Sequence, residues 1–188
     1  MIDYSGLFSS DTASFMRSPV RDIFKRVDLS KIYSFAGGYP SADAFDLEGL
    51  SEVASQVIAT QGSKAFQYNA TQGINELRLA LSRRYGVAID RIQVTTSSQQ
   101  GIDVCTRVMI NPGDVVLTSN PSYLGALQSF RSYRATIVGV DYCSDVEQFR
   151  QRYAVAIEKC LNEGKRVKFL YTIPDFQNPS GETLSLQH

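Results

Sequence analysis

The fold is decided by residues 92–140, which read IQVTTSSQQGIDVCTRVMINPGDVVLTSNPSYLGALQSFRSYRATIVGV. Short apolar runs at 92–96, 115–118 and 136–140 alternate with stretches in which apolar residues recur at helical spacing. The turn 111–114, Asn-Pro-Gly-Asp, separates a helical stretch from the run that follows it. Because strands joined by helices of crossover length run parallel in one sheet, this stretch predicts an α/β fold.

The same alternation continues on both sides of this stretch. Further helices are expected at 19–27, 47–57, 74–85 and 146–157. A fourth strand is expected at 167–173, and Asp46 and Gly86 are of the residue types that begin and end helices. The sequence therefore predicts three layers, a mostly parallel sheet flanked by helices, with ligands bound beyond the carboxyl ends of the strands.

The composition is that of one soluble globular domain or part of one, with 188 residues, 43% hydrophobic and 20% charged. Lysine and arginine together number 19, as do aspartate and glutamate, so no net charge favours a nucleic acid or an anionic membrane as a partner. No run of about 18 apolar residues indicates a membrane span, and the first residues lack the apolar core of a signal peptide. We therefore expect a cytoplasmic protein, for which small neutral or zwitterionic ligands remain open.

The cysteines and the single histidine argue against several common kinds of catalytic and metal site. Cys105, Cys143 and Cys160 lie far apart, without the Cys-x-x-Cys pair of a zinc or redox site, which favours a reducing compartment. The single histidine, His188, is the last residue, so neither a Ser-His-Asp hydrolase nor a His-ligated metal site is expected.

Each of three loops that follow predicted strands carries side chains that could either bind a ligand or serve the fold alone. Ser97 and Ser98 precede a helix whose free N–H groups can bind a phosphate, although a plain serine cap explains such a pair more simply. Tyr123 can stack on a flat ligand or pack against the sheet. Asn178 can donate its amide to a ring oxygen or a carboxylate, or form an ordinary Asn-Pro turn.

A glycine pair adds a fourth signal. Gly37 and Gly38 would let backbone N–H groups approach a carboxylate closely, although a chain reversal explains them equally well. Each signal is weak alone. Their combination on separate loops supplies a phosphate site, an aromatic platform, an amide and a carboxylate-sized pocket, and favours a real ligand site.

Several segments together resemble the landmarks of class I/II aminotransferases, which are pyridoxal-phosphate-dependent enzymes of fold type I. In order, they are AGGYPSADAF (36–45), FQYNATQGINELRLALSRRYGV (66–87), VTTSSQQGIDVCTRVMINPGDVVLTSNPSYLGALQSF (94–130) and FLYTIPDFQNPSGETLS (169–185). The resemblance covers nearly the whole chain from about Ser18 onward. It is closest to the group of 2-aminoadipate and kynurenine aminotransferases, which includes the effector domains of MocR-type regulators.

The resemblance implies pyridoxal 5'-phosphate as the cofactor. Ser98 and Gln99 would then bind its phosphate, with Ser97 standing where relatives usually have glycine. Tyr123 would stack on the pyridine ring, and Asn178 would bond the ring hydroxyl.

The resemblance also implies a homodimer and a substrate site. Tyr68 would reach the phosphate in the neighbouring subunit, and Gly38 would contact the α-carboxylate of the substrate. Ser18 and Arg21 would lie around the substrate side chain, although an exposed arginine that solvates a helix is the simpler reading of Arg21.

In terms of domains, the resemblance implies an N-terminal arm and first helix at 1–33. Residues 34–188 would form the N-terminal portion of the cofactor-binding large domain. The family's Schiff-base lysine and its acidic partner for the pyridine nitrogen follow the motif that contains Asn178, and no lysine of this chain stands in such a context.

The expected function is that of an aminotransferase fragment, inactive by itself. The parent enzyme would move an amino group between an amino acid and a 2-oxo acid. The alternatives are the aminotransferase-like effector domain of a MocR-type transcription regulator and a non-catalytic remnant of the fold.

Overall fold

The computed structural model describes residues 4–9, 28, 31–32 and 40–188. The helix expected at 19–27 lies outside the described residues, and so do Ser18, Arg21 and the pair Gly37 and Gly38. The expected domain boundary after residue 33 therefore stays a prediction. By its contacts the chain divides into two compact units, one spanning Tyr39–Ser98 and the other comprising Met1–Gly38 and Gln99–His188.

The larger elements follow the predicted alternation of helices and strands. In chain order they are α2 (Leu47–Gln61), α3 (Asn75–Tyr85), α4 (Ser98–Met109), β1 (Val115–Asn120), α5 (Leu124–Ser132), β2 (Thr136–Asp141), α6 (Val146–Asn162) and β3 (Val167–Tyr171). Single 3-10 turns accompany them: η1 (Ser5–Leu7), η4 (Ala42–Ala44), η5 (Gly62–Phe66) and η6 (Ile89–Arg91).

The described strands form a parallel sheet in the order β2-β1-β3. Against β2, β1 pairs without a break from Val115 opposite Thr136 to Asn120 opposite Asp141. Against β3, the register shifts between Val115 and Val116. The predicted parallel arrangement is therefore confirmed, and the carboxyl ends of all three described strands lie at the same edge.

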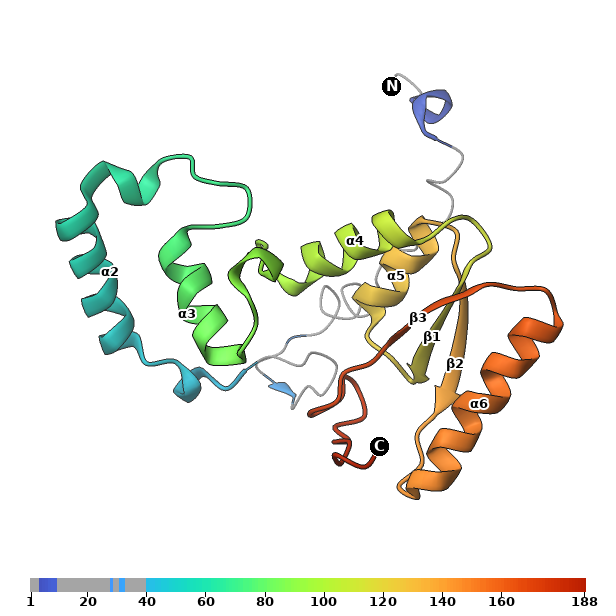
Figure 1. The fold of residues 1–188 in the computed structure, drawn as a ribbon. Helices are drawn as coiled ribbons and strands as arrows, with labels where there is room; N and C mark the ends of the chain where they lie inside the picture. Colours follow the sequence, from blue (N-terminus) through green and yellow to red (C-terminus); the bar gives the residue numbers. More distant parts are fainter. Residues whose placement is uncertain (1–3, 10–27, 29–30, 33–39) are drawn as a thin grey trace. The chain divides into compact units, whose positions relative to one another are not determined.

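Helices cover both faces of this sheet, with α4 and α5 on one side and α6 on the other (Figure 1). On the α5 face, Phe130 is 1% exposed and meets the rings of Phe169 and Tyr171 edge to face, at centroid distances of 5.7 and 5.5 Å. On the α6 face, Leu117 and Cys160 form the core. The predicted three-layer α/β fold is confirmed in this unit.

Two helix ends fall at Asp46 and Gly86 as the sequence predicted, and Asp145 is a third cap that it did not single out. The Asp46 carboxylate accepts the backbone N–H of Gly49 at 2.9 Å and caps α2. The Asp145 carboxylate accepts the N–H of Gln148 at 2.8 Å and caps α6. Gly86 ends α3 with a φ of 63°, a left-handed conformation that glycine adopts without steric cost.

The strand predicted at 92–96 is wrong. Backbone groups of this segment are bonded outside any sheet, since the N–H of Val94 donates to the carbonyl of Gln72 at 2.9 Å. The guanidinium of Arg78 donates to the carbonyls of Ile92 and Ile89 at 3.0 and 2.6 Å. A β-strand needs a neighbouring strand to receive its ladder hydrogen bonds, and here a loop and an arginine take that place.

The unit spanning Tyr39–Ser98 has no buried core in its helices. No residue of α2 or α3 is buried, and Leu47, Leu50 and Val53 of the predicted apolar stripe are 71%, 58% and 57% exposed. An amphipathic helix normally buries such a stripe, so this face of α2 is an unpartnered apolar surface.

The described residues contain neither a membrane-spanning helix nor a cluster of metal-binding side chains. Among them, no helix is both long and apolar enough to cross a bilayer. Within the same residues, no cluster of three or more histidine, cysteine, aspartate or glutamate side chains could hold a metal ion.

The turn before β1 is held by a buried carboxylate. Asp114 Oδ2 accepts the backbone N–H of Asn111 at 2.8 Å and lies 3.5 Å from Lys168 Nζ. The hydrogen bond from Asn111, and then the positive charge of Lys168, hold the pKa of Asp114 below its usual value against the effect of burial.

We predict that Asp114→Asn destabilises the protein at neutral pH and has little effect in acid. A carboxyl whose pKa is lowered by folding stabilises the native state above its unfolded pKa of about 4, and this stabilisation is lost as the pH falls through the folded pKa. Urea unfolding of both proteins at neutral pH and at about pH 3 measures the difference. Asp175→Asn, at an exposed position, is the control, and an equal destabilisation at both pH values would contradict the prediction.

Candidate functional site

The loop between β1 and α5 brings Tyr123 to the carboxyl edge of the sheet. Strand β1 ends at Asn120, and Tyr123 is the N-cap residue of α5, with φ −63° and ψ 120° and no side-chain cap. Ser122 between them is 7% exposed, while Tyr123 is half-buried. This position is where ligands bind in parallel α/β sheets.

Gln99, in the first turn of α4, meets Tyr123 over the backbone of Gly125. The Gln99 amide donates to the carbonyl of Gly125 at 3.0 Å and to Ser129 Oγ at 2.9 Å. A Cβ atom added at Gly125 would lie 2.6 Å from Cζ and Oη of Tyr123 and would also collide with Gln99 Oε1. The structure therefore brings together two of the predicted site residues, and a glycine makes room for both.

This geometry limits what Gln99 can offer to a phosphate. Both N–H groups of its amide already donate to α5, and the remaining amide oxygen only accepts hydrogen bonds. A phosphate at this helix start would therefore use the backbone N–H of Gln99 and neighbouring N–H groups rather than its side chain.

The loop after β3 carries Asn178 and a buried glutamine that sequence reasoning did not single out. Asn178 is exposed, and the described residues provide no hydrogen-bond partner for its side chain. Gln177 is 6% exposed, and its amide donates to the carbonyl of Pro121 at 2.8 Å and to Ser119 Oγ at 3.1 Å. The loop of Asn178 is thus bonded directly to the loop of Tyr123.

Ser122 and Tyr171 are two further residues that the motifs did not identify. Ser122 Oγ is buried and has no hydrogen-bond partner among the described residues, which is rare for a hydroxyl and leaves a polar group available beside Tyr123. Tyr171 ends β3, and burial, with a smaller contribution from Tyr123, raises the pKa of its phenol. Its position near the end of a predicted strand was the sequence signal that could have found it, and its edge-to-face contact with Phe130 is visible only in the structure.

The other predicted cofactor residues lie in the unit that spans Tyr39–Ser98. Ser98 is the first residue of α4 and is exposed, as is Ser97, whose carbonyl accepts the hydroxyl of Thr95 at 2.9 Å. Tyr68 is 98% exposed and makes no side-chain hydrogen bond among the described residues. A tyrosine this exposed is free to reach another molecule.

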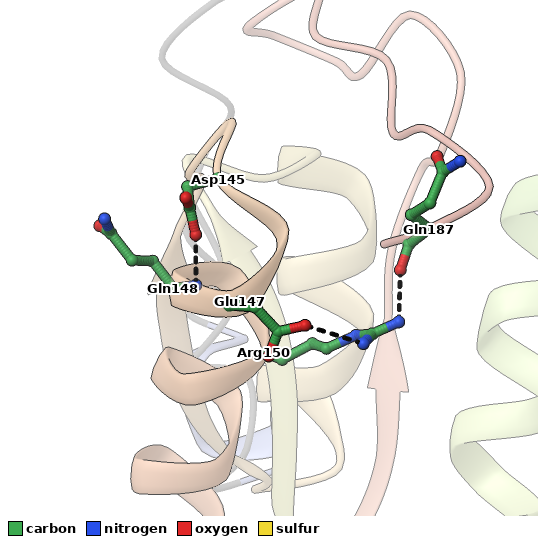
Figure 2. Close-up of polar contacts among 5 residues, drawn as sticks. All are labelled: Asp145, Glu147, Gln148, Arg150 and Gln187. Atoms are coloured by element: carbon green, nitrogen blue, oxygen red, sulfur yellow. Dashed lines mark hydrogen bonds and ion pairs between the residues drawn. The ribbon is translucent and has the colours of Figure 1, made fainter.

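The C-terminal segment is tied down on the α6 side of the sheet. Arg150 lies between the carboxylate of Glu147, at 3.2 Å, and the main-chain carbonyl of Gln187, at 2.6 Å (Figure 2). His188 stacks on Tyr142 and meets Phe149 edge to face. A cavity of about 20 Å³ beneath this segment has room for about one water molecule and is too small for a cofactor.

Comparison with known proteins agrees with this architecture. Residues 29–188 match the family described as Aminotransferase class I and II. The aromatic-amino-acid aminotransferase 1 of Thermococcus litoralis is 36% identical over 98% of this chain, and the 2-aminoadipate transaminase of Thermus thermophilus is 33% identical over 96% of it. The HTH-type transcriptional regulator YdcR of Escherichia coli, itself described as uncharacterized, is 31% identical over 88% of the chain.

Solved structures are similar over the same extent. The kynurenine aminotransferase of Pyrococcus horikoshii, in complex with PMP, superposes with a TM-score of 0.84 at 34% identity and covers 97% of this chain and 46% of its own. The α-aminoadipate aminotransferase of Thermus thermophilus, complexed with N-(5'-phosphopyridoxyl)-L-leucine, gives a TM-score of 0.81 at 32% identity, with 98% and 45% covered.

The fold and the matched motifs define a class of protein, the fold type I aminotransferases. This chain belongs to the class I and II aminotransferase family. The chain spans about half the length of the curated relatives it matches, with 45% and 44% of the first two covered.

We predict that Gly125→Ala shifts the ends of the Tyr123 and Gln99 side chains, because its Cβ would lie where those ends are. An unhindered Gly→Ala change inside a helix stabilises by about 1 kcal/mol, and this shift should offset such a gain, so the full gain would contradict the close packing. Urea unfolding and the tyrosine near-ultraviolet circular dichroism measure the effect. In a Tyr123→Ala background the change should be more favourable to stability.

Proposed function

We propose that this chain carries part of the pyridoxal-phosphate site of an aminotransferase. The observation that carries the proposal is the meeting of Gln99 and Tyr123 at Gly125, on the same strand edge as the loop of Asn178. In this family member, motif residues from separate loops converge where a parallel sheet binds ligands.

The described residues fit this cofactor by their chemistry. Tyr123 offers a half-buried aromatic face to a ring, the Asn178 amide is free to donate to a ring oxygen, and Ser122 has a buried hydroxyl without a partner. The resemblance assigns the phosphate to Ser97, Ser98 and Gln99, and of these Gln99 lies in the same unit as Tyr123 and Asn178. When bound, the cofactor supplies an electron sink for chemistry at the amino-acid Cα.

The substrates proposed for the whole protein are an amino acid and a 2-oxo acid. Gly38 would contact the substrate α-carboxylate, and Ser18 and Arg21 would lie around the side chain. These roles rest on the resemblance, since all three positions lie outside the described residues.

A homodimer is part of the same proposal. Tyr68, 98% exposed, would reach the cofactor phosphate of the neighbouring subunit. The apolar stripe of α2, at Leu47, Leu50 and Val53, is exposed, and a second subunit could cover it.

Three of the described lysines, Lys159, Lys165 and Lys168, lie away from the proposed site. Lys165 and Lys168 lie at the amino end of β3, and Lys168 pairs with Asp114. Lys159 lies on the exposed surface of α6. Because the site is at the opposite edge of the sheet, we propose that transamination requires a lysine other than these.

A second candidate function is the aminotransferase-like effector domain of a transcription regulator. The similarity to YdcR, 31% identity over 88% of this chain, is the observation that favours it. Both functions use a cofactor site, so binding of pyridoxal phosphate supports either, and loss of binding would leave a non-catalytic remnant of the fold.

For the compartment, we propose the cytoplasm. The three cysteines of the chain, Cys105, Cys143 and Cys160, all lie in the described part and are free thiols, as a reducing environment maintains them.

We predict that the purified chain binds pyridoxal phosphate reversibly, measured by absorbance and fluorescence titration. Tyr123→Ala, which removes the stacking ring, and Asn178→Ala, which removes one hydrogen bond, should each weaken binding by about three- to tenfold. Asn162→Ala, at the exposed end of α6, is the control and should leave the affinity unchanged. Borohydride treatment should trap no adduct at a specific lysine. Equal affinity for wild type and both site variants would contradict the proposed site.

A further inference from the structure

One buried amide links the two loops that carry the proposed ring contacts. Gln177 is 6% exposed and lies in the loop after β3, immediately before Asn178. Its Nε2 donates to the carbonyl of Pro121 at 2.8 Å and to Ser119 Oγ at 3.1 Å. Both acceptors belong to the end of β1 and the turn that leads to Tyr123.

The oxygen of the same amide, Gln177 Oε1, accepts hydrogen bonds within the loop after β3. The N–H of Ser180 donates to Gln177 Oε1 at 2.8 Å, and the hydroxyl of Ser180 lies 2.6 Å from the same oxygen. In the main chain, the N–H of Gln177 donates to the carbonyl of Glu182 at 2.8 Å, and its carbonyl accepts the N–H of Gly181 at 2.6 Å. The loop of Asn178 is therefore closed around Gln177.

Both donors of this amide are used, and its oxygen accepts the N–H of Ser180. The Ser180 hydroxyl lies 2.6 Å from the same oxygen and 2.5 Å from Glu182 Oε2, and its one proton is donated to one of these two acceptors at a time. In a buried network, removing one partner leaves another group unsatisfied, so the two loops hold each other at one separation. A substituted side chain at this position would release that constraint.

We infer that Gln177 is a positioning residue, which sets the distance between Tyr123 and Asn178 so that one ring can be stacked and hydrogen-bonded at once. This inference rests on the proposed cofactor site. Gln177 itself touches no ligand in this role. It acts through the β1 turn on one side and through its chain neighbour on the other.

The opposing view is that Gln177 only stabilises the fold. A structural amide would lower the unfolding temperature when replaced, but it would leave intact the separate contributions of Tyr123 and Asn178 to binding. A positioning amide makes those two contributions depend on each other and on Gln177, and a double-mutant cycle detects this dependence.

The test uses variants that remove different parts of the network. Gln177→Glu keeps acceptor oxygens for Ser180 but loses both donors to the β1 turn. Ser119→Ala is the milder version, since it removes one acceptor only. Ser180→Ala removes the hydroxyl on the other side of the amide and leaves both donors in place.

Arg150→Ala, in α6, is the matched control for the same C-terminal segment. It breaks the bond to the carbonyl of Gln187 at the far end of the segment and leaves the Gln177 network intact (Figure 2). If looseness of this segment alone weakened binding, Arg150→Ala would weaken it as well.

Each variant is measured by pyridoxal-phosphate titration, thermal unfolding and amide hydrogen exchange without ligand. We expect Gln177→Glu to weaken binding about tenfold and Ser119→Ala about threefold, with Ser180→Ala and Arg150→Ala within about twofold of wild type. Exchange should rise in Gln177→Glu at both 119–123 and 175–183, and in Arg150→Ala only near 187. Tyr123→Ala and Asn178→Ala should cost less in the Gln177→Glu background than in wild type.

Two results would overturn the inference while leaving the cofactor site standing. One is Gln177→Glu with wild-type affinity, and the other is full additivity of Gln177→Glu with Tyr123→Ala and Asn178→Ala. A wild-type chain that binds no pyridoxal phosphate would overturn the proposed function and this inference together. Faster exchange at both loops in Gln177→Glu, measured without ligand, would in that case show only that the amide joins them.

Discussion

The parallel pairing of β1 with a strand on each side is the constraint on which the rest of this unit depends. Val115, Val116 and Leu117 are at most 2% exposed, because helices cover both faces of the strand and neighbouring strands take its backbone groups. Parallel pairing places the carboxyl ends of the strands at one edge, so the loops that leave β1 and β3 must meet there. The site residues of these loops are neighbours for that reason.

The proposed site is held together by hydrogen bonds between side chains and main-chain carbonyls. Gln99 ties α4 to the start of α5, and Gln177 ties the loop after β3 to the turn after β1. Both glutamines use their amide donors on the protein, so neither amide is available to donate to a ligand. Among the side chains of the two loops, those proposed to meet a ligand are the Tyr123 ring, the Asn178 amide and the buried hydroxyl of Ser122.

The unit spanning Tyr39–Ser98 has a different energetic character. Its helices are capped and of helical sequence pattern, yet they bury no residue, and the apolar stripe of α2 stays exposed. Helices of this length draw most of their stability from tertiary packing. The apolar stripe of α2 is therefore surface that packing within this unit leaves exposed.

The sequence by itself determined the helices from α2 onward, the strands β1, β2 and β3 and their parallel direction, and it marked Tyr123 and Asn178 as residues at strand ends. These depend on local patterns, the 3.6-residue and two-residue periods and the residue types at helix ends, Asp46 and Gly86. Only the tertiary structure decided that 92–96 bonds to a loop and Arg78 instead of a sheet, and that Gln177 reaches Ser119, 58 residues earlier. Such pairings depend on which distant backbone and side-chain groups become neighbours, and no local period in the sequence carries that information.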